Sequence, residues 1–115
     1  MTDNNKSILN STKLLMGIMP SVTAFDTPLI FHINTCFTIL YQLGVGSEPF
    51  IITGANDTWD DFTSEIDLEL VKSYVYMKAR MMFDPPTGSV ADSMKNMISE
   101  LEWRINIAVD PSKEA

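Results

Sequence analysis

The chain has 115 residues, of which 45% are hydrophobic and 20% charged, and its formal net charge is −7. This length and composition are typical of one globular domain, so they exclude two independently folding domains and wholesale disorder. The negative charge disfavours nonspecific binding to nucleic acid or to an anionic membrane, because both attract clustered Lys and Arg.

The first half of the chain predicts two helices. Apolar residues recur at helical spacing between positions 6 and 18, and Met19-Pro20-Ser21 ends that helix. Asp26 is suited to the N-cap of a second helix, which runs from about Thr27 to Leu43. Gly44 follows as the C′ glycine that ends it.

A short insertion, irregular or β-hairpin-like, is predicted at 45–59, between the second and third helices. Phe50 to Thr53 form a strand-like run between two glycines, but the sequence offers this run no obvious partner strand. Thr58 is suited to cap a single helical turn directly after it.

Two further helices complete the chain. The third is expected from about Ile66 to Phe83, where Asp84-Pro85-Pro86 ends it. Ser89 or Thr87 caps a fourth helix that runs to about Ile107. The predicted fold class is therefore all-α: one small four-helix domain over 1–115, with flexible ends at about 1–5 and 110–115.

The apolar residues are more numerous than one small core requires. They wrap nearly all the way round the third helix, which predicts a central helix that a neighbouring chain partly covers. Trp103 and Ile107 form a second apolar patch on the far side of the fourth helix, and tryptophan is enriched at interface hot spots. Packing of this patch against the N-terminal helix or the insertion is the alternative. Phe31 stands on the polar side of the second helix as a further candidate anchor.

Export and membrane insertion find no support in the sequence. Cys36 is the only cysteine, so no intrachain disulfide can form. The segment 1–13 is rich in polar residues and lacks the apolar block of a signal peptide. No run approaches the ~18 uninterrupted apolar residues of a membrane span. We therefore expect a protein of the reducing cytoplasm with no membrane partner.

No catalytic or metal-binding constellation emerges. His32 and Cys36 lie one turn apart on the second helix, but no third residue is evident to orient a base, and two ligands are too few for a structural zinc site. An acidic cluster lacks the spacing and central glycine of a calcium loop. Its members are Asp57, Asp60, Asp61, Glu65, Asp67 and Glu69. We expect no enzyme, no cofactor and no metal; a small enzyme or metal-dependent regulator built on these residues is the least favoured alternative.

Four short motifs occur in order along the chain. They are Leu43-Gly44-Val45-Gly46, Trp59-Asp60-Asp61-Phe62, Phe83-Asp84-Pro85-Pro86-Thr87 and Glu100-Leu101-Glu102-Trp103-Arg104-Ile105-Asn106. The ordered set spans roughly residues 8–107 and resembles the head–tail connector (adaptor, or head-completion) proteins of tailed bacteriophages and prophages.

The resemblance implies a structural protein of the virion neck, between head and tail, that is assembled in the host cytoplasm. It implies a homo-oligomeric ring, commonly a dodecamer of about 12 copies, beneath the portal protein. Such a ring extends the DNA channel, through which DNA passes without sequence-specific binding, and supports the next neck or tail component. A tail-completion or stopper protein of the neck is the alternative.

Subunit or portal contacts are expected from residues that the predicted core does not need. The insertion has the form of a segment that reaches a neighbour by strand addition or points into the channel. Glu100, Glu102 and Arg104 are expected on a solvated face, where an Arg104 pair with the next subunit would set register more than affinity. The candidate interface residues are Phe31, Phe50, Ile51, Ile52, Tyr76, Trp103, Arg104 and Ile107.

Overall fold

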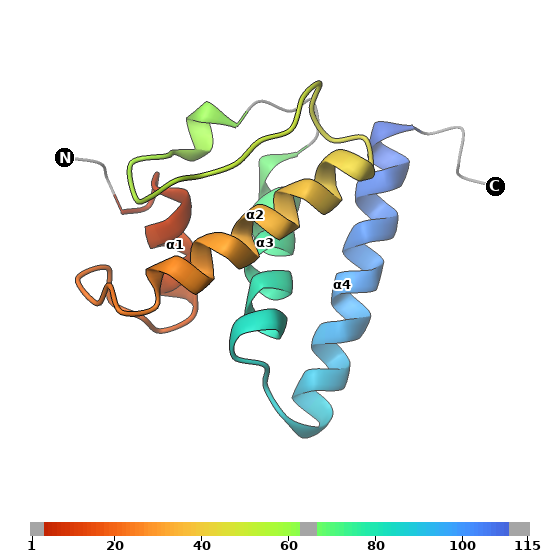
Figure 1. Cartoon of the computed structure of the whole chain (residues 1–115). Helices are drawn as coiled ribbons and strands as arrows, with labels where there is room; N and C mark the ends of the chain where they lie inside the picture. Colours follow the sequence, from red (N-terminus) through yellow and green to blue (C-terminus); the bar gives the residue numbers. More distant parts are fainter. Residues whose placement is uncertain (1–3, 63–66, 111–115) are drawn as a thin grey trace.

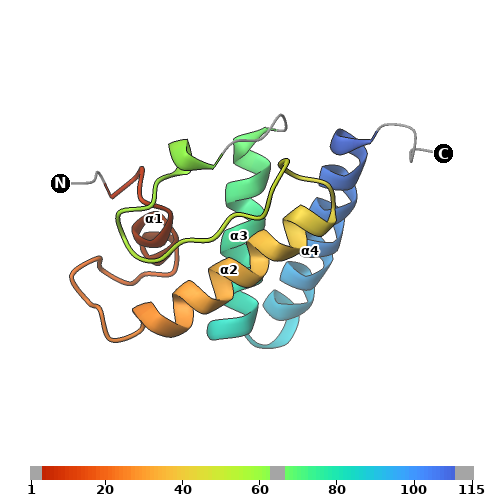
Figure 2. The same ribbon diagram turned by 45° about the horizontal axis from the view of Figure 1, so that its top comes forward.

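The computed structural model describes residues 4–62 and 67–110 and confirms the all-α fold (Figure 1). α3 is the central helix, in contact with each of the other three. α1 and α4 lie on opposite flanks of α3, and α2 crosses in front of it in both views (Figure 1, Figure 2). The elements are α1 Ile8–Leu15, α2 Asp26–Gln42, the 3-10 turn η1 Trp59–Asp61, α3 Leu68–Phe83 and α4 Gly88–Val109.

The first helix is shorter than the predicted 6–18. Ser7 is its N-cap: the Ser7 hydroxyl accepts a hydrogen bond from the Asn10 N–H at 3.1 Å and donates one to the Ala55 carbonyl at 2.7 Å. The helix ends at Leu15, and Gly17 follows at a φ of +81°, a conformation that stops regular helix. One serine therefore both starts α1 and ties it to the insertion.

A buried lysine determines how the chain passes from α1 to α2. The Lys13 side chain is fully buried, and its ammonium donates to the carbonyls of Pro20 at 3.1 Å and Val22 at 2.6 Å and to Asp26 Oδ1 at 2.7 Å. These three acceptors match the three N–H donors of an ammonium group. The connection 16–25 is thus wrapped around one charge.

The same contact explains why the predicted N-cap of α2 is wrong. Asp26 is the first residue of the helix, and Phe25 occupies the N-cap position without a side-chain hydrogen bond. The Asp26 carboxylate is needed as the counter-ion of Lys13, because a buried ammonium without a counter-charge is costly. Tertiary pairing has taken precedence over local capping.

The end of α2 agrees with the prediction. Gly44 has a φ of +99° and closes a Schellman motif, in which its N–H donates to Tyr41 O and the Val45 N–H donates to Leu40 O, both at 2.9 Å. A Cβ placed on Gly44 would lie 2.6 Å from Val109 Cγ1. Glycine is therefore required twice here, by the backbone conformation and by the approach of α4.

The insertion is irregular, with no strand among its described residues 45–59. The side chain of Asn34, on α2, forms the hydrogen bonds with the extended run that a partner strand would otherwise form. Its Oδ1 accepts from the Ile52 N–H at 2.7 Å, and its Nδ2 donates to the Ile52 carbonyl at 3.0 Å. The predicted turn after the insertion is confirmed as η1, where the Thr58 N–H donates to Asp61 Oδ2 at 2.9 Å. The insertion consequently lies against its own domain.

Aromatic rings fill the space beneath the insertion. Phe37 of α2 packs against Phe50 and Phe62, with ring centroids 4.9 and 5.0 Å apart, and against Trp59 at 6.1 Å. The Trp59 indole N–H donates to the Ser11 hydroxyl at 2.9 Å, which satisfies the polar atom of a buried side chain. This cluster attaches the insertion and α1 to α2.

The third helix is covered by its own chain along its length. Asp67 caps it by accepting from the Glu69 N–H at 3.0 Å, and within Leu68–Phe83 only Glu69 is exposed. The predicted start near Ile66 lies outside the described residues. The central position predicted for this helix is therefore reached within one chain, and any cover by a neighbour can involve only half-buried side chains.

A part-buried hydrogen bond joins α3 to α4. The hydroxyl of Tyr74, a fully buried residue, donates to Glu102 Oε2 at 2.7 Å, and Lys78 Nζ lies 3.9 Å from the same oxygen. Burial and the bond to Glu102 raise the pKa of Tyr74 above its usual range. Glu102 thus departs from the solvated face expected for it. α4, capped at Thr87, also runs two residues beyond the predicted Ile107, to Val109.

Replacing Lys13 should destabilise the protein strongly. Lys13→Met keeps most of the side-chain volume but removes all three donors, and we expect a loss of about 3 kcal/mol in the free energy of unfolding. Lys95→Met, at an exposed position of α4, is the matched control and should change it by less than about 0.5 kcal/mol. Urea denaturation followed by circular dichroism measures both. Equal midpoints for the two variants would contradict the anchoring role of Lys13.

Replacing Gly44 should also destabilise the fold. Gly44→Ala combines a positive φ with a Cβ against Val109, so we expect a loss of about 2 kcal/mol in unfolding free energy. Gly54→Ala is the control, because a Cβ at Gly54 meets nothing within 4 Å. The double variant Gly44→Ala with Val109→Ala relieves only the contact and should recover part of the loss in the same urea titration. Full recovery would show that the backbone conformation costs nothing.

Candidate subunit interface

The insertion places its three candidate residues on different sides of the chain. Alternate side chains of an extended segment point to opposite faces. Ile52 is only 1% exposed and belongs to the core, and Phe50 is half-buried in the aromatic cluster with Phe37 and Phe62. Ile51, between them, is 62% exposed. Of the three, only Ile51 offers its side chain to another molecule.

The fourth helix presents Trp103 on its outer face. Ile98 and Ile105 are buried against the rest of the domain, and Trp103 lies on the opposite side of α4 and is 57% exposed. It is therefore not covered by the N-terminal helix or the insertion, which was the alternative expectation. Ile107, one turn further on, is half-buried. Arg104 is occupied within its own helix, where its Nη2 lies 3.1 Å from Glu100 Oε1.

Phe31 and Tyr76 lie elsewhere. Phe31 is 69% exposed on α2, and its ring stands edge-on to His32 at 5.7 Å. The ring of His32 in turn lies 6.4 Å from that of Phe83. Tyr76, on α3, is half-buried, and its hydroxyl accepts from Arg80 Nη1 at 2.9 Å. The eight candidates therefore form no single surface, because Phe50 and Ile52 point inward from the insertion and the other six are spread over the insertion, α2, α3 and α4.

The His32 and Cys36 pair has no geometry for catalysis. Cys36 is buried, its thiol points to the Val75 carbonyl at 3.8 Å, and burial raises its pKa to about 12. A thiol that stays protonated is neither a nucleophile nor a metal ligand. Nδ1 of His32 is buried and has no hydrogen-bond partner. Its ring packs between those of Phe31 and Phe83, and the lack of a partner for Nδ1 applies to residues 4–62 and 67–110.

Three members of the acidic cluster serve the local fold. Asp57 Oδ2 accepts hydrogen bonds from the backbone N–H groups of Thr53 and Gly54, at 2.7 and 3.1 Å. Asp61 accepts from the Thr58 N–H at η1, and Asp67 accepts from the Glu69 N–H at the start of α3. Glu65 lies outside the described residues. No group of three or more His, Cys, Asp or Glu side chains in the described ranges is placed to hold a metal ion.

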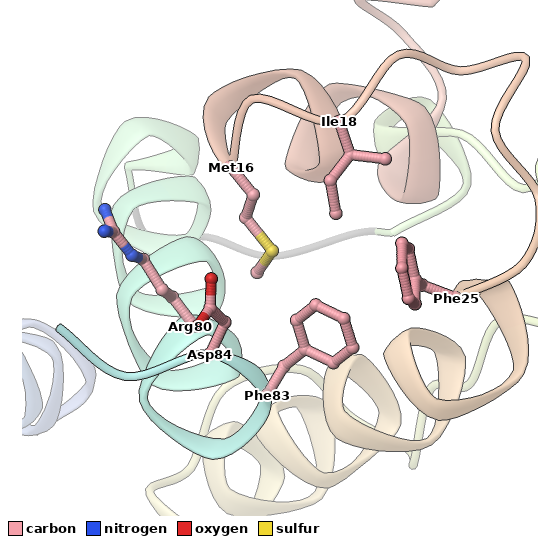
Figure 3. A pocket seen from close by; sticks show the side chains of 6 residues that line it. All are labelled: Met16, Ile18, Phe25, Arg80, Phe83 and Asp84. Atoms are coloured by element: carbon pink, nitrogen blue, oxygen red, sulfur yellow. The ribbon is translucent and has the colours of Figure 1, made fainter.

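A pocket that the sequence did not reveal lies between the α1–α2 connection and the end of α3 (Figure 3). Its volume is about 330 Å³. Four apolar side chains converge on it from separate parts of the chain, and the rings of Phe25 and Phe83 meet edge to face at 5.6 Å. Its lining is Met16, Ile18, Phe25, Arg80, Phe83 and Asp84. The only signal in the sequence was an apolar run, Met16 to Met19, too long for the end of a short helix.

The geometry therefore offers an outward tryptophan and a pocket lined by four apolar and two charged residues. No helix in the described part of the chain has the length and apolar character needed to cross a bilayer.

The comparisons with known proteins give one positive finding. No curated protein and no solved structure matches the chain. A family model described as phage connector protein matches residues 8–112, which covers all four helices and the insertion. By this match the chain belongs to the phage connector protein family.

Proposed function

We propose that this protein is a head–tail connector subunit of a tailed phage, and that copies of it form a ring beneath the portal protein. The ring extends the DNA channel and supports attachment of the next neck or tail component. The family match over residues 8–112 carries this proposal. In this proposal the protein works in the virion neck, after assembly in the host cytoplasm.

The surface supports an assembling role. Single exposed apolar side chains are normal, but here several large ones gather at the end of α1 and along the connection to α2. Others stand on α2, the insertion and α4. The exposed large hydrophobic residues are Leu14, Leu15, Met19, Val22, Phe25, Phe31, Tyr41, Ile51, Val90, Met97 and Trp103. A subunit that contacts a neighbour on each side, a portal above and a further component below needs apolar surface in several directions.

The charge supports a channel that does not hold DNA. The net charge is −7, and Asp60, Asp61, Asp67 and Glu69 are all exposed around η1 and the start of α3. Affinity for duplex DNA comes largely from Lys and Arg contacts to phosphates. A ring of acidic subunits therefore lets DNA pass without binding its sequence or gripping its backbone.

A ring contact requires two different surfaces on each subunit, because head-to-tail contacts are heterologous. The fold provides different surfaces on its two flanks, with α1 and the connection on one side of α3 and α4 on the other (Figure 1). This arrangement supports a head-to-tail ring more readily than a symmetric dimer, which would use one surface twice. The proposed number of about 12 copies rests on the family resemblance alone.

Mixing the purified protein with its cognate portal tests the proposal. We expect a complex in which several copies of this chain bind one portal ring, measured by light scattering after size exclusion and imaged by electron microscopy. The control variant Gly54→Ala should bind equally, because its Cβ meets no other atom within 4 Å. Binding to the distal neck or tail component, with no binding to the portal, would assign the stopper or tail-completion role instead.

A further inference from the structure

We propose that Trp103 of one copy enters the pocket of the next copy, lined by Met16, Ile18, Phe25 and Phe83. This inference rests on the proposed function, since it names the two surfaces through which subunits of the ring meet. It joins the most outward aromatic side chain of α4 to the apolar pocket at the opposite flank of the domain.

The pocket suits one aromatic side chain. Figure 3 shows Met16 and Ile18 pointing into the space from the connection, with Phe25 and Phe83 closing two further sides. Its volume of about 330 Å³ is at the small end of the range for ligand pockets, so it is too small for a helix. Aromatic anchors in apolar pockets are the usual centre of a protein interface.

Charges beside the pocket complement the charges beside Trp103. Arg80 lies in the last turn of α3 and Asp84 is the residue that ends this helix, while Glu100 and Arg104 lie one turn apart on α4. An α4 that lies along the end of α3 in the same chain direction would bring Glu100 to Arg80 and Arg104 to Asp84.

The pocket charges are still available for such pairs. Arg80 donates to the Tyr76 hydroxyl, and neither Arg80 nor Asp84 forms an ion pair within residues 4–62 and 67–110. The Glu100–Arg104 pair is more than half exposed, so exchanging it for partners on another copy costs little. These contacts would set the register of the two helices, and the indole would supply most of the affinity.

The two surfaces do not meet within one copy. The pocket is lined from the α1–α2 connection and the end of α3, whereas Trp103 is exposed on α4. α1 and α4 lie on opposite sides of α3 (Figure 1, Figure 2). Each copy therefore receives one tryptophan and donates one. Such a head-to-tail contact propagates from copy to copy and closes into a ring when the rotation between copies allows it.

Two variants, each lacking one surface, test the contact directly. Trp103→Ala removes the indole, and Phe25→Glu places a charge on an exposed wall of the pocket. Sedimentation velocity at about 100 µM should show self-association of the wild type and at least tenfold weaker association of each variant alone. An equal mixture should form a 1:1 dimer and nothing larger, because one intact pocket and one intact tryptophan remain. A mixture that stays monomeric, or variants that associate like the wild type, would overturn the inference.

Disulfide cross-linking between introduced cysteines can detect the contact even when binding is weak. Arg80→Cys mixed with Glu100→Cys should give a disulfide-linked dimer under mild oxidation, since these positions face each other. Arg80→Cys mixed with Lys95→Cys is the matched control and should not, and the native Cys36 is buried in all of them. Equal cross-linking of both mixtures would contradict the proposed register.

Portal binding separates this inference from the proposed function. If Trp103→Ala still forms complete rings on the portal, the tryptophan contact is wrong and the connector role stands. If the wild type self-associates as described but never binds a portal, the contact stands and the connector role fails. If Phe25→Glu loses portal binding while its self-association is unchanged, the pocket takes a portal segment and the second-copy contact is overturned.

Discussion

The buried ammonium of Lys13 is the interaction on which the arrangement of this domain depends. A charge without water must be met by acceptors, and the chain supplies two carbonyls and the Asp26 carboxylate within 3.1 Å. To bring them there, the connection 16–25 folds back over the end of α1. The same path carries Met16, Ile18 and Phe25 to the end of α3. The pocket is thus a by-product of satisfying one lysine.

The remaining surfaces follow from how α3 is covered. α2 crosses the front of α3, and α4 is joined to α3 by the Tyr74–Glu102 hydrogen bond. The insertion is held on α2 by Asn34 and the aromatic rings. The Cα positions extend 46 × 36 × 19 Å, so the domain is flat and its core thin. A thin core leaves one face of each flanking helix uncovered, which is why apolar side chains remain outside on both flanks.

Predictions from the sequence succeeded where local rules decide and failed where distant residues meet. Helical spacing placed α2, α3 and α4 and put Trp103 on the outer face, because a regular helix fixes the direction of each side chain. Gly44 was identifiable because its backbone conformation excludes most other residues. Asp26 was misassigned as the N-cap because its partner, Lys13, is thirteen positions earlier. The extended run at Ile52 showed no partner strand in the sequence because its partner is a side chain, Asn34. The pocket has only a weak local signature, the apolar run Met16 to Met19, since its walls come from two separate parts of the chain.

The contact between Gly44 and Val109 has a consequence for assembly. At the end of α2 Gly44 has no side chain, so its backbone lies directly against the Val109 side chain at the end of α4. Beside this contact the Asn106 Nδ2 donates to the Leu43 carbonyl at 3.1 Å. In a ring of identical subunits, a small difference in angle within each subunit is repeated at every step and leaves a gap or an overlap when the ring closes. A β-branched valine has few rotamers, so this contact holds the end of α2 and the end of α4 at the same angle in every copy.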